Sequence, residues 1–125
     1  MVGETLARIL RTKGNFNVAD VVENAEDAMA WLSEQEADYP VDLALVDVVL
    51  PNTSGIELVS MIQQKYPGLP CLMISGRSGG QYVKRSLAAG ARGYVLKDDF
   101  NDVMTGIHHV LEGSTYLSKQ LSKEG

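Results

Sequence analysis

Residues 41–55 read VDLALVDVVLPNTSG, and this stretch decides the fold. A short apolar run rich in Val and Leu predicts a strand that is buried on both faces, as in parallel sheets covered by helices. Pro51 cannot continue a sheet, and Ser54, followed three residues later by Glu57, offers a helix start. Asp47 is therefore expected at the carboxyl end of a strand, the edge where open α/β sheets bind ligands.

Short strands and helices are expected to alternate along the whole chain. This alternation predicts one α/β domain, a doubly wound parallel sheet with helices on both faces. The domain should take up residues 1–125, with a polar, linker-like tail from about residue 113. We expect strands over 16–22, 41–47, 70–75 and 93–97, and helices over 2–13, 24–35, 54–66, 82–89 and 99–112.

Size and composition narrow the class of protein. A chain of 125 residues that is 45% hydrophobic suits a single core, and a net charge of −5 disfavours direct nucleic-acid binding. The single cysteine, Cys71, lies in an apolar predicted strand, so it should be a buried, inert thiol that suits a reducing cytoplasm. No apolar run of about 18 residues and no leader is found, so we expect a soluble, cytoplasmic chain without membrane contact.

Three predicted strands end in a chemically useful side chain: Asp47, Ser75 and Lys97. Each has an ordinary explanation on its own, since Asp47 could simply cap its turn, Ser75 could be a strand-end hydroxyl and Lys97 a solvated amine. The carboxyl ends of parallel strands lie on one rim, so the three are expected together. A carboxylate that can attack phosphorus, an ammonium that can pair with the phosphoryl charge and a hydroxyl that can bond one of its oxygens make a phosphoryl site.

The motifs around these residues resemble the receiver domains of two-component response regulators. Asp47 begins the pattern Asp-x-x-Leu-Pro-x-x-x-Gly, and Ile-Ser-Gly, Leu-Ala-Ala-Gly-Ala-Arg-Gly-Tyr and Val-Leu-Lys-Asp follow at Ser75, Tyr94 and Lys97. The resemblance runs from about residue 16 to the end. It implies a flavodoxin-like fold with strand order 2-1-3-4-5 and a regulatory role, not an enzyme.

The same resemblance implies a role for each site residue. Asp47 would be the phosphoacceptor for a sensor histidine kinase, and Ser75 the hydroxyl that moves toward the phosphate. Lys97 would be the charge partner, and Tyr94 the aromatic residue whose rotamer reports the switch. Val49 would supply its backbone carbonyl to Mg²⁺, with Asp47 as the other ligand.

Two further motifs refine the resemblance. Lys-Asp-Asp at 97–99 and Gly-Ser-Thr-Tyr-Leu-Ser at 113–118 are similar to NarL/FixJ-type receivers, which precede a LuxR-type helix-turn-helix output domain. That output domain is absent from these 125 residues. The implied function is a phosphorelay switch for transcription regulation.

The first residues depart from the family pattern. Receivers begin with a central strand that ends in an acidic pair, and residues 1–6 align just after that pair. We therefore expect this strand and its Mg²⁺-binding pair to be missing from the chain. The start could be truncated or mis-assigned, or the strand could be absent from the native protein. Losing about five buried aliphatic side chains forfeits about 10 kcal/mol. We therefore expect a homodimer that exchanges or adds strands, or else direct pairing of 16–22 with 41–47. Metal binding should be weak.

Other interpretations remain open at this stage. One is a phosphorylation-independent interaction or dimerisation module, favoured by the absent acidic pair. Another is a small flavodoxin-like enzyme, although the segment 76–80 lacks the Lys-Ser/Thr of a phosphate-binding loop. The adjacent His108 and His109 point to different sides of the last helix and are expected on the surface, while Asp98 and Asp99 should help to start that helix.

Overall fold

The computed structural model describes residues 24–34, 42–50, 53–76, 80–97 and 99–118. The chain divides into two units, residues 1–40 and 41–125. In the first unit the described element is helix α2 (Ala25–Glu34), which confirms the helix expected over 24–35. The side chain of Asn24 caps this helix, because it accepts a hydrogen bond from the backbone N–H of Asp27 at 2.8 Å. The expected helix over 2–13 and strand over 16–22 lie outside the described residues.

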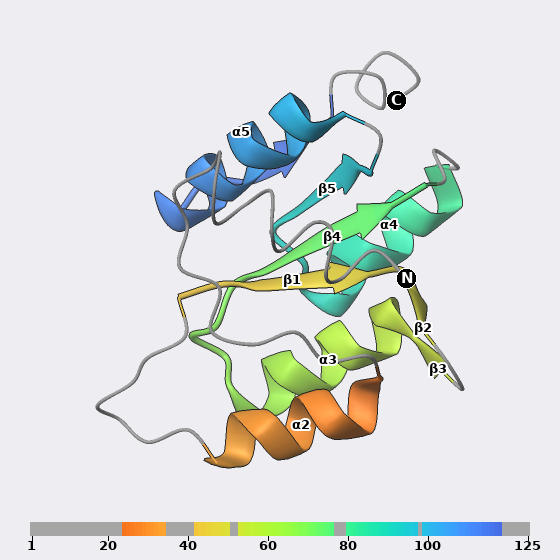
Figure 1. The fold of residues 1–125 in the computed structure, drawn as a ribbon, viewed down its shortest axis with the longest axis vertical. Helices are drawn as coiled ribbons and strands as arrows, with labels where there is room; N and C mark the ends of the chain where they lie inside the picture. The colour runs from red at the N-terminus through yellow and green to blue at the C-terminus, as the bar shows by residue number, and fades with distance from the viewer. Residues whose placement is uncertain (1–23, 35–41, 51–52, 77–79, 98, 119–125) are drawn as a thin grey trace. The chain divides into compact units, whose positions relative to one another are not determined.

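The second unit alternates strands and helices, as expected (Figure 1). A small antiparallel hairpin, formed by β2 and β3, interrupts the alternation just after Asp47. The elements are β1 (Ala44–Asp47), β2 (Val49–Leu50), β3 (Thr53–Ser54), α3 (Gly55–Lys65), β4 (Cys71–Ser75), α4 (Gly80–Ala89), β5 (Gly93–Leu96), α5 (Phe100–Leu111) and β6 (Tyr116–Leu117).

The main sheet has four strands in the order β1-β4-β5-β6, and every pair is parallel. Asp47 pairs with Ile74, and Ser75 pairs with Leu96, so the carboxyl ends of β1, β4 and β5 meet at one edge. The expected parallel sheet is thereby confirmed for these strands. Among the described strands, β1 is the edge strand on the side opposite to β6.

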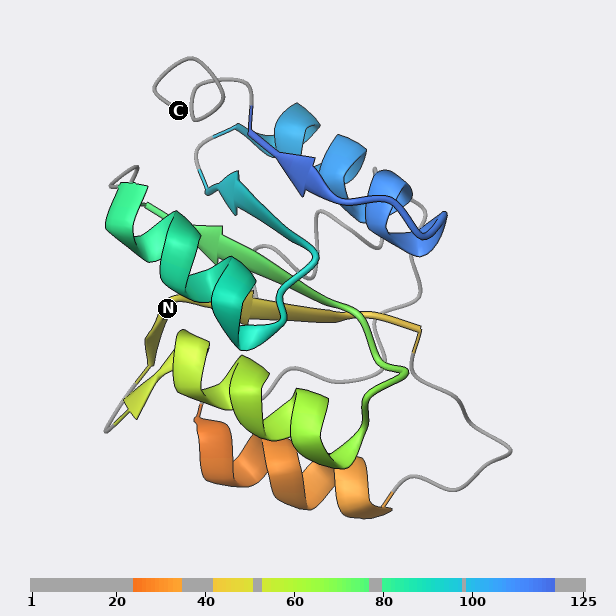
Figure 2. The same ribbon diagram turned by 180° about the vertical axis from the view of Figure 1, so that it is seen from behind.

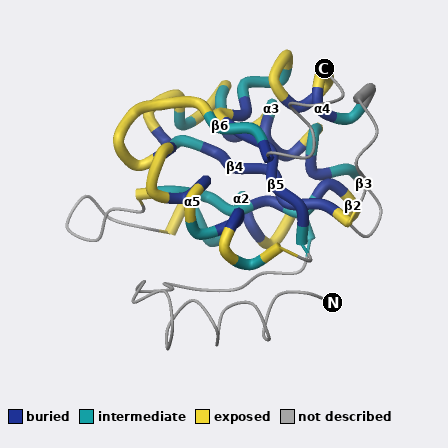
Figure 3. Tube along the Cα trace, turned by 90° about the horizontal axis from the view of Figure 1, so that it is seen from above, coloured by how far each residue is buried: buried dark blue, intermediate teal, exposed yellow. Residues whose placement is uncertain are grey.

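Helices cover both faces of this sheet. Figures 1 and 2 show α3 and α4 on one face and α5 on the other. Figure 3 shows the buried residues running through β4 and β5 between these layers, and every residue of both strands is buried. Continuous burial explains why the sequences of these strands, apart from Ser75 at the end of β4, do not alternate with polar residues. None of the helices in the described ranges is long and apolar enough to cross a membrane.

Local signals in the sequence set the helix ends. The Ser54 hydroxyl accepts a hydrogen bond from the N–H of Glu57 at 3.2 Å, which makes Ser54 the N-cap of α3, as predicted. Asp99 caps α5 in the same way through the N–H of Asp102 at 3.1 Å, whereas Asp98 lies outside the described residues. Gly90 follows α4 with φ of +114°, a left-handed conformation that favours glycine.

Strand β6 was not expected from the sequence, which predicted a polar tail from about residue 113. Its N-terminal residue, Tyr116, donates its N–H to the Arg92 carbonyl at 3.1 Å, and Ser118 donates to the Tyr94 carbonyl at 3.0 Å. The chain therefore turns back after α5 and lies parallel to β5. A two-residue strand is too short to show a periodic pattern, so sequence periodicity could not reveal it.

Candidate functional site

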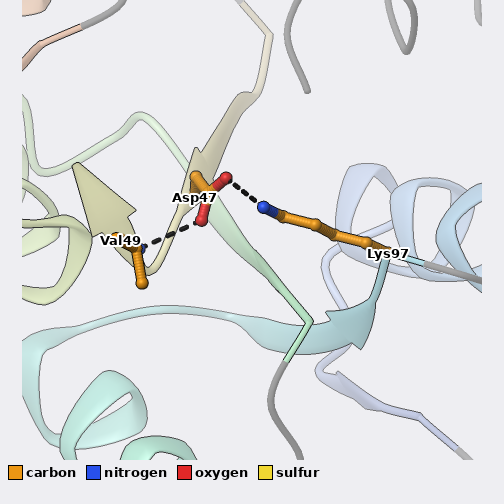
Figure 4. Close-up of polar contacts among 3 residues, drawn as sticks. All are labelled: Asp47, Val49 and Lys97. Carbon is orange, nitrogen blue, oxygen red and sulfur yellow. Dashed lines mark hydrogen bonds and ion pairs between the residues drawn. The ribbon is translucent and has the colours of Figure 1, made fainter. Parts of the chain in front are cut away.

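The carboxylate of Asp47 is held from two sides (Figure 4). Its Oδ1 accepts a hydrogen bond from the backbone N–H of Val49 at 3.0 Å. Its Oδ2 lies 2.6 Å from the Nζ of Lys97, which directly follows β5. Because β4 lies between β1 and β5, this ion pair reaches across the middle strand of the three. The structure thus places Asp47 and Lys97 at one edge of the sheet and in direct contact.

The Asp47–Lys97 ion pair remains within reach of solvent. The exposed fractions of the two side chains are 21% for Asp47 and 28% for Lys97. Ion pairs with this degree of exposure contribute only about 0–1 kcal/mol to stability, because water screens the charges and both side chains lose freedom. The pair is therefore poorly suited to holding the fold together, and a small anion in solution can reach it.

Ser75 and Tyr94 belong to the same edge and strand, but both are covered. Ser75 ends β4 with 1% exposure, and its carbonyl accepts the N–H of Lys97 at 2.9 Å. Tyr94 lies in β5 between Met73 of β4 and Leu117 of β6, and it is fully buried. The sheet thus brings the backbones of the predicted residues together, with Asp47 and Lys97 accessible and Ser75 and Tyr94 inside.

Gly55 allows the turn after Asp47 to close. Its N–H donates to the Val48 carbonyl at 2.8 Å, and a Cβ at this position would lie only 1.9 Å from the Asp47 carbonyl oxygen. A side chain would therefore push α3 away from the end of β1. The sequence motif includes this glycine, but only the structure shows which atom it must avoid.

A magnesium site built from these residues alone is incomplete. Mg²⁺ prefers six oxygen ligands in octahedral geometry, usually including one or two carboxylates. Both oxygens of Asp47 already have partners, Val49 and Lys97. In the ranges that the structure describes, no cluster of three or more His, Cys, Asp or Glu side chains could hold a metal ion. The described residues do not fit a strong Mg²⁺ site.

The remaining candidates from the sequence behave as structural residues. His108 and His109 are both exposed, as expected. Cys71 is fully buried, and burial raises the pKa of its thiol to about 11, so that the reactive thiolate is rare at neutral pH. The expectation of an inert thiol agrees with this environment.

Comparison with known proteins identifies the family. Residues 1–108 match the response regulator receiver domain. The chain therefore belongs to the receiver domain family of two-component response regulators, a class of non-enzymatic signalling modules. The Fimbriae Z protein of Salmonella typhimurium is a relative with 29% identity, over 90% of this chain and 52% of its own length. The chain spans about half the length of the curated relatives that it matches first.

Solved structures agree on the fold. A LuxR-family response regulator from Aurantimonas superposes with a TM-score of 0.87 at 24% identity, over 97% of this chain and 84% of the other. A CheY-like receiver domain protein from Methanospirillum hungatei gives 0.74 at 26% identity, over 98% and 88%. Receiver domains of LuxR-family regulators are thus among the structural neighbours, and the flavodoxin-like receiver fold is established.

Proposed function

We propose that Asp47 is the phosphoacceptor of this receiver domain and that a sensor histidine kinase supplies the phosphoryl group. The observation that carries the proposal is the ion pair at 2.6 Å between an accessible strand-end carboxylate and Lys97. A phosphoryl group is a stronger partner for an ammonium than a carboxylate, because it carries more charge and more acceptor oxygens.

The chemistry uses groups already in place. One Asp47 oxygen attacks phosphorus, and the bond from phosphorus to the donor's leaving group breaks as the new O–P bond forms. The N–H of Val49 holds Oδ1, so it orients the carboxylate for this attack. Lys97 exchanges Oδ2 for the oxygens of the incoming phosphoryl group and stabilises their charge.

Ser75 and Tyr94 are the proposed switch residues. Ser75 is 1% exposed, and we propose that its hydroxyl turns toward the phosphoryl group and bonds one of its oxygens. Tyr94 is fully buried, and we propose that its rotamer changes with the state of the site. Phosphate then shifts the population between two existing conformations through the interactions that it makes in only one of them.

Mg²⁺ is the expected cofactor of the family, and in this chain Asp47 and the Val49 carbonyl would hold it. Since the described residues offer a single carboxylate at this point, we expect weak binding and slow phosphorylation of residues 1–125. When bound, the ion would neutralise charge on the phosphoryl oxygens.

Intact-mass measurement after incubation with acetyl phosphate tests the proposal, in parallel samples with and without Mg²⁺. We expect a slowly formed adduct with the mass of one phosphoryl group, and its complete loss in Asp47→Asn. The matched control is Asp42→Asn, because Asp42 is an exposed carboxylate five positions earlier. An adduct that survives Asp47→Asn, or a folded chain that forms none, contradicts the proposal.

A phosphorylation-independent interaction module is the second candidate function. The observation that favours it is the lack of an acidic cluster beside Asp47 among the described residues. The retention of Asp47 and Lys97 as a close pair argues against it, since a module without phosphoryl chemistry does not need that pair. A folded chain that forms no adduct with acetyl phosphate would favour the interaction module over the phosphoacceptor.

The downstream role is proposed from the relatives. Curated relatives with about twice this length include transcriptional regulatory proteins. We propose that the receiver controls a NarL/FixJ-type output with a LuxR-type DNA-binding domain, and that this chain itself does not contact nucleic acid.

A further inference from the structure

In the described part of the chain, the segment after α5 pairs with the sheet over a short stretch. The register of β6 places Tyr116 beside Gly93 and Leu117 beside Tyr94. This pairing includes backbone hydrogen bonds from the Tyr116 N–H to the Arg92 carbonyl and from the Ser118 N–H to the Tyr94 carbonyl. An edge strand this short opens easily unless its side chains hold it.

The side chain of Tyr116 makes the contacts that keep β6 in place. Its hydroxyl donates a hydrogen bond to Oδ1 of Asp102, and its ring lies against the His109 ring with 5.1 Å between centroids. Burial, and then the hydrogen bond and charge of Asp102, raise the pKa of Tyr116 to about 12. The hydroxyl is therefore protonated and able to donate at physiological pH.

The buried carboxylate of Asp102 has the Tyr116 hydroxyl as its hydrogen-bond donor. The residue is 6% exposed, and its Oδ2 is buried without a hydrogen-bond partner among the described residues. Oδ1 accepts the Tyr116 hydroxyl, the one side-chain donor that the described residues offer to this carboxylate. Buried charge without a partner is unfavourable, so Asp102 favours the state in which Tyr116 stays docked.

Two glycines shape the place where Tyr116 sits. A Cβ on Gly93 would lie 2.5 Å from the Tyr116 carbonyl oxygen, and a Cβ on Gly106 would lie 3.1 Å from the Tyr116 ring and 2.8 Å from Val95. Side chains at either position would lift β6 from the sheet. The sequence therefore makes room for Tyr116 on both β5 and α5.

Strand β6 pairs with β5, and β5 is also the strand that ends at the candidate site. Lys97 follows β5, and its ammonium ties that end of the strand across β4 to Asp47 on β1. Three residues earlier, the Tyr94 carbonyl accepts the hydrogen bond from Ser118. Breaking the ion pair removes one side-chain restraint on residue 97, whose backbone N–H stays bonded to the Ser75 carbonyl at 2.9 Å.

We propose that β6 is a latched strap: Tyr116, held by Asp102, keeps the segment after α5 on the edge of β5, and the strap loosens when the Asp47–Lys97 ion pair is broken. Residues 116–118, the last that the structure describes, would then respond to the candidate site. The inference is independent of whether Asp47 is phosphorylated, because it concerns the ion pair in the unmodified chain.

Amide hydrogen exchange of Ser118, followed by NMR, tests the latch, with the Ile62 amide in α3 as an internal reference for global opening. We expect Tyr116→Phe to speed Ser118 exchange at least about 10-fold relative to Ile62. As a control, Tyr66→Phe removes a tyrosine hydroxyl at the end of α3 and should leave Ser118 exchange unchanged. Asp102→Ala should resemble Tyr116→Phe, whereas Asp102→Asn keeps an acceptor and should stay near wild type.

The same amides test the link to the ion pair. We expect Asp47→Asn to speed Ser118 exchange at least about threefold relative to Ile62, and Asp42→Asn to leave it unchanged. A Tyr116→Phe chain with Ser118 exchange within about twofold of wild type overturns the latch, and an unchanged Asp47→Asn chain overturns the link. If Tyr116→Phe fails to fold, the double variant Tyr116→Phe/Asp102→Asn removes the unpaired charge, and the same limits apply to it.

Discussion

At the scale of single residues, two carboxylates in this domain have opposite environments. Asp47 is partly exposed, forms an ion pair with Lys97 and accepts a hydrogen bond from the N–H of Val49. Asp102 is buried and has the Tyr116 hydroxyl as its side-chain donor. An accessible paired carboxylate is suited to reaction with a ligand, while a buried one restrains the part of the chain that satisfies it. The two residues therefore have different proposed roles, although both are aspartates near sheet edges.

The raised pKa of Tyr116 predicts how stability depends on alkaline pH. Its folded-state pKa of about 12 exceeds the reference value of 10.0, so the folded state retains this proton when the unfolded state has lost it. The contribution is fully present below pH 10 and is lost as pH rises from 10 to 12. We expect the free energy of unfolding to fall more steeply over that range in wild type than in Tyr116→Phe.

Urea unfolding at several alkaline pH values checks this expectation. The ultraviolet difference spectrum between the two chains should also show one tyrosine that ionises near pH 12. Parallel stability curves for the two chains would show that the surroundings of Tyr116 do not favour its protonated form.

At the scale of elements, the turn between β1 and α3 is the most restricted connection of the site. Gly55 begins α3 where a Cβ would meet the carbonyl oxygen of Asp47, the residue that ends β1. Strand, turn and helix are therefore fixed relative to one another at the candidate phosphoacceptor. A shift of α3 here would also disturb the hairpin that presents the N–H of Val49.

Gly55→Ala is expected to destabilise the domain by about 1–3 kcal/mol, because the added methyl group collides with backbone that cannot rotate away. Gly68→Ala is the matched control, since nothing lies within 4 Å of a Cβ at that position. Its effect should stay within about 0.5 kcal/mol. Midpoints of urea unfolding measure both changes, and equal midpoints for the two variants would contradict the assigned contact.

At the scale of the whole molecule, the side of β1 that faces away from β4 has no strand partner among the described residues. Unpaired strand edges expose backbone donors and acceptors and favour pairing with another strand. A second copy of this chain is the proposed occupant of that edge, as expected from the sequence. The competing arrangement is pairing of residues 16–22 with β1 of the same chain.

Sedimentation equilibrium at micromolar concentration separates these arrangements. We expect twice the mass of the chain, with a dimer that dissociates on dilution. The control is a charged substitution on β1, Leu45→Lys, which should shift the mass toward the monomer if the edge is the interface. A monomer in wild type supports pairing within the chain.

The sequence by itself determined the class of fold and which side chains end its strands at one edge. Continuous apolar runs predicted buried parallel strands, and the residue at the end of each run identified Asp47, Ser75 and Lys97. Capping residues such as Ser54 and Asp99 placed the helix starts. These features are local, because a strand's burial pattern and a helix cap depend on residues within a few positions of one another.

Only the tertiary structure decided the contacts between residues far apart in the chain. It put Lys97 against Oδ2 of Asp47, buried Tyr94, and joined Tyr116 to Asp102 beneath a two-residue strand. The sequence pattern of 113–118 has too few residues to distinguish a strand from a tail, and the partner that stabilises it lies 14 positions away. Such contacts arise when separate elements pack on a shared core, so no local pattern encodes them.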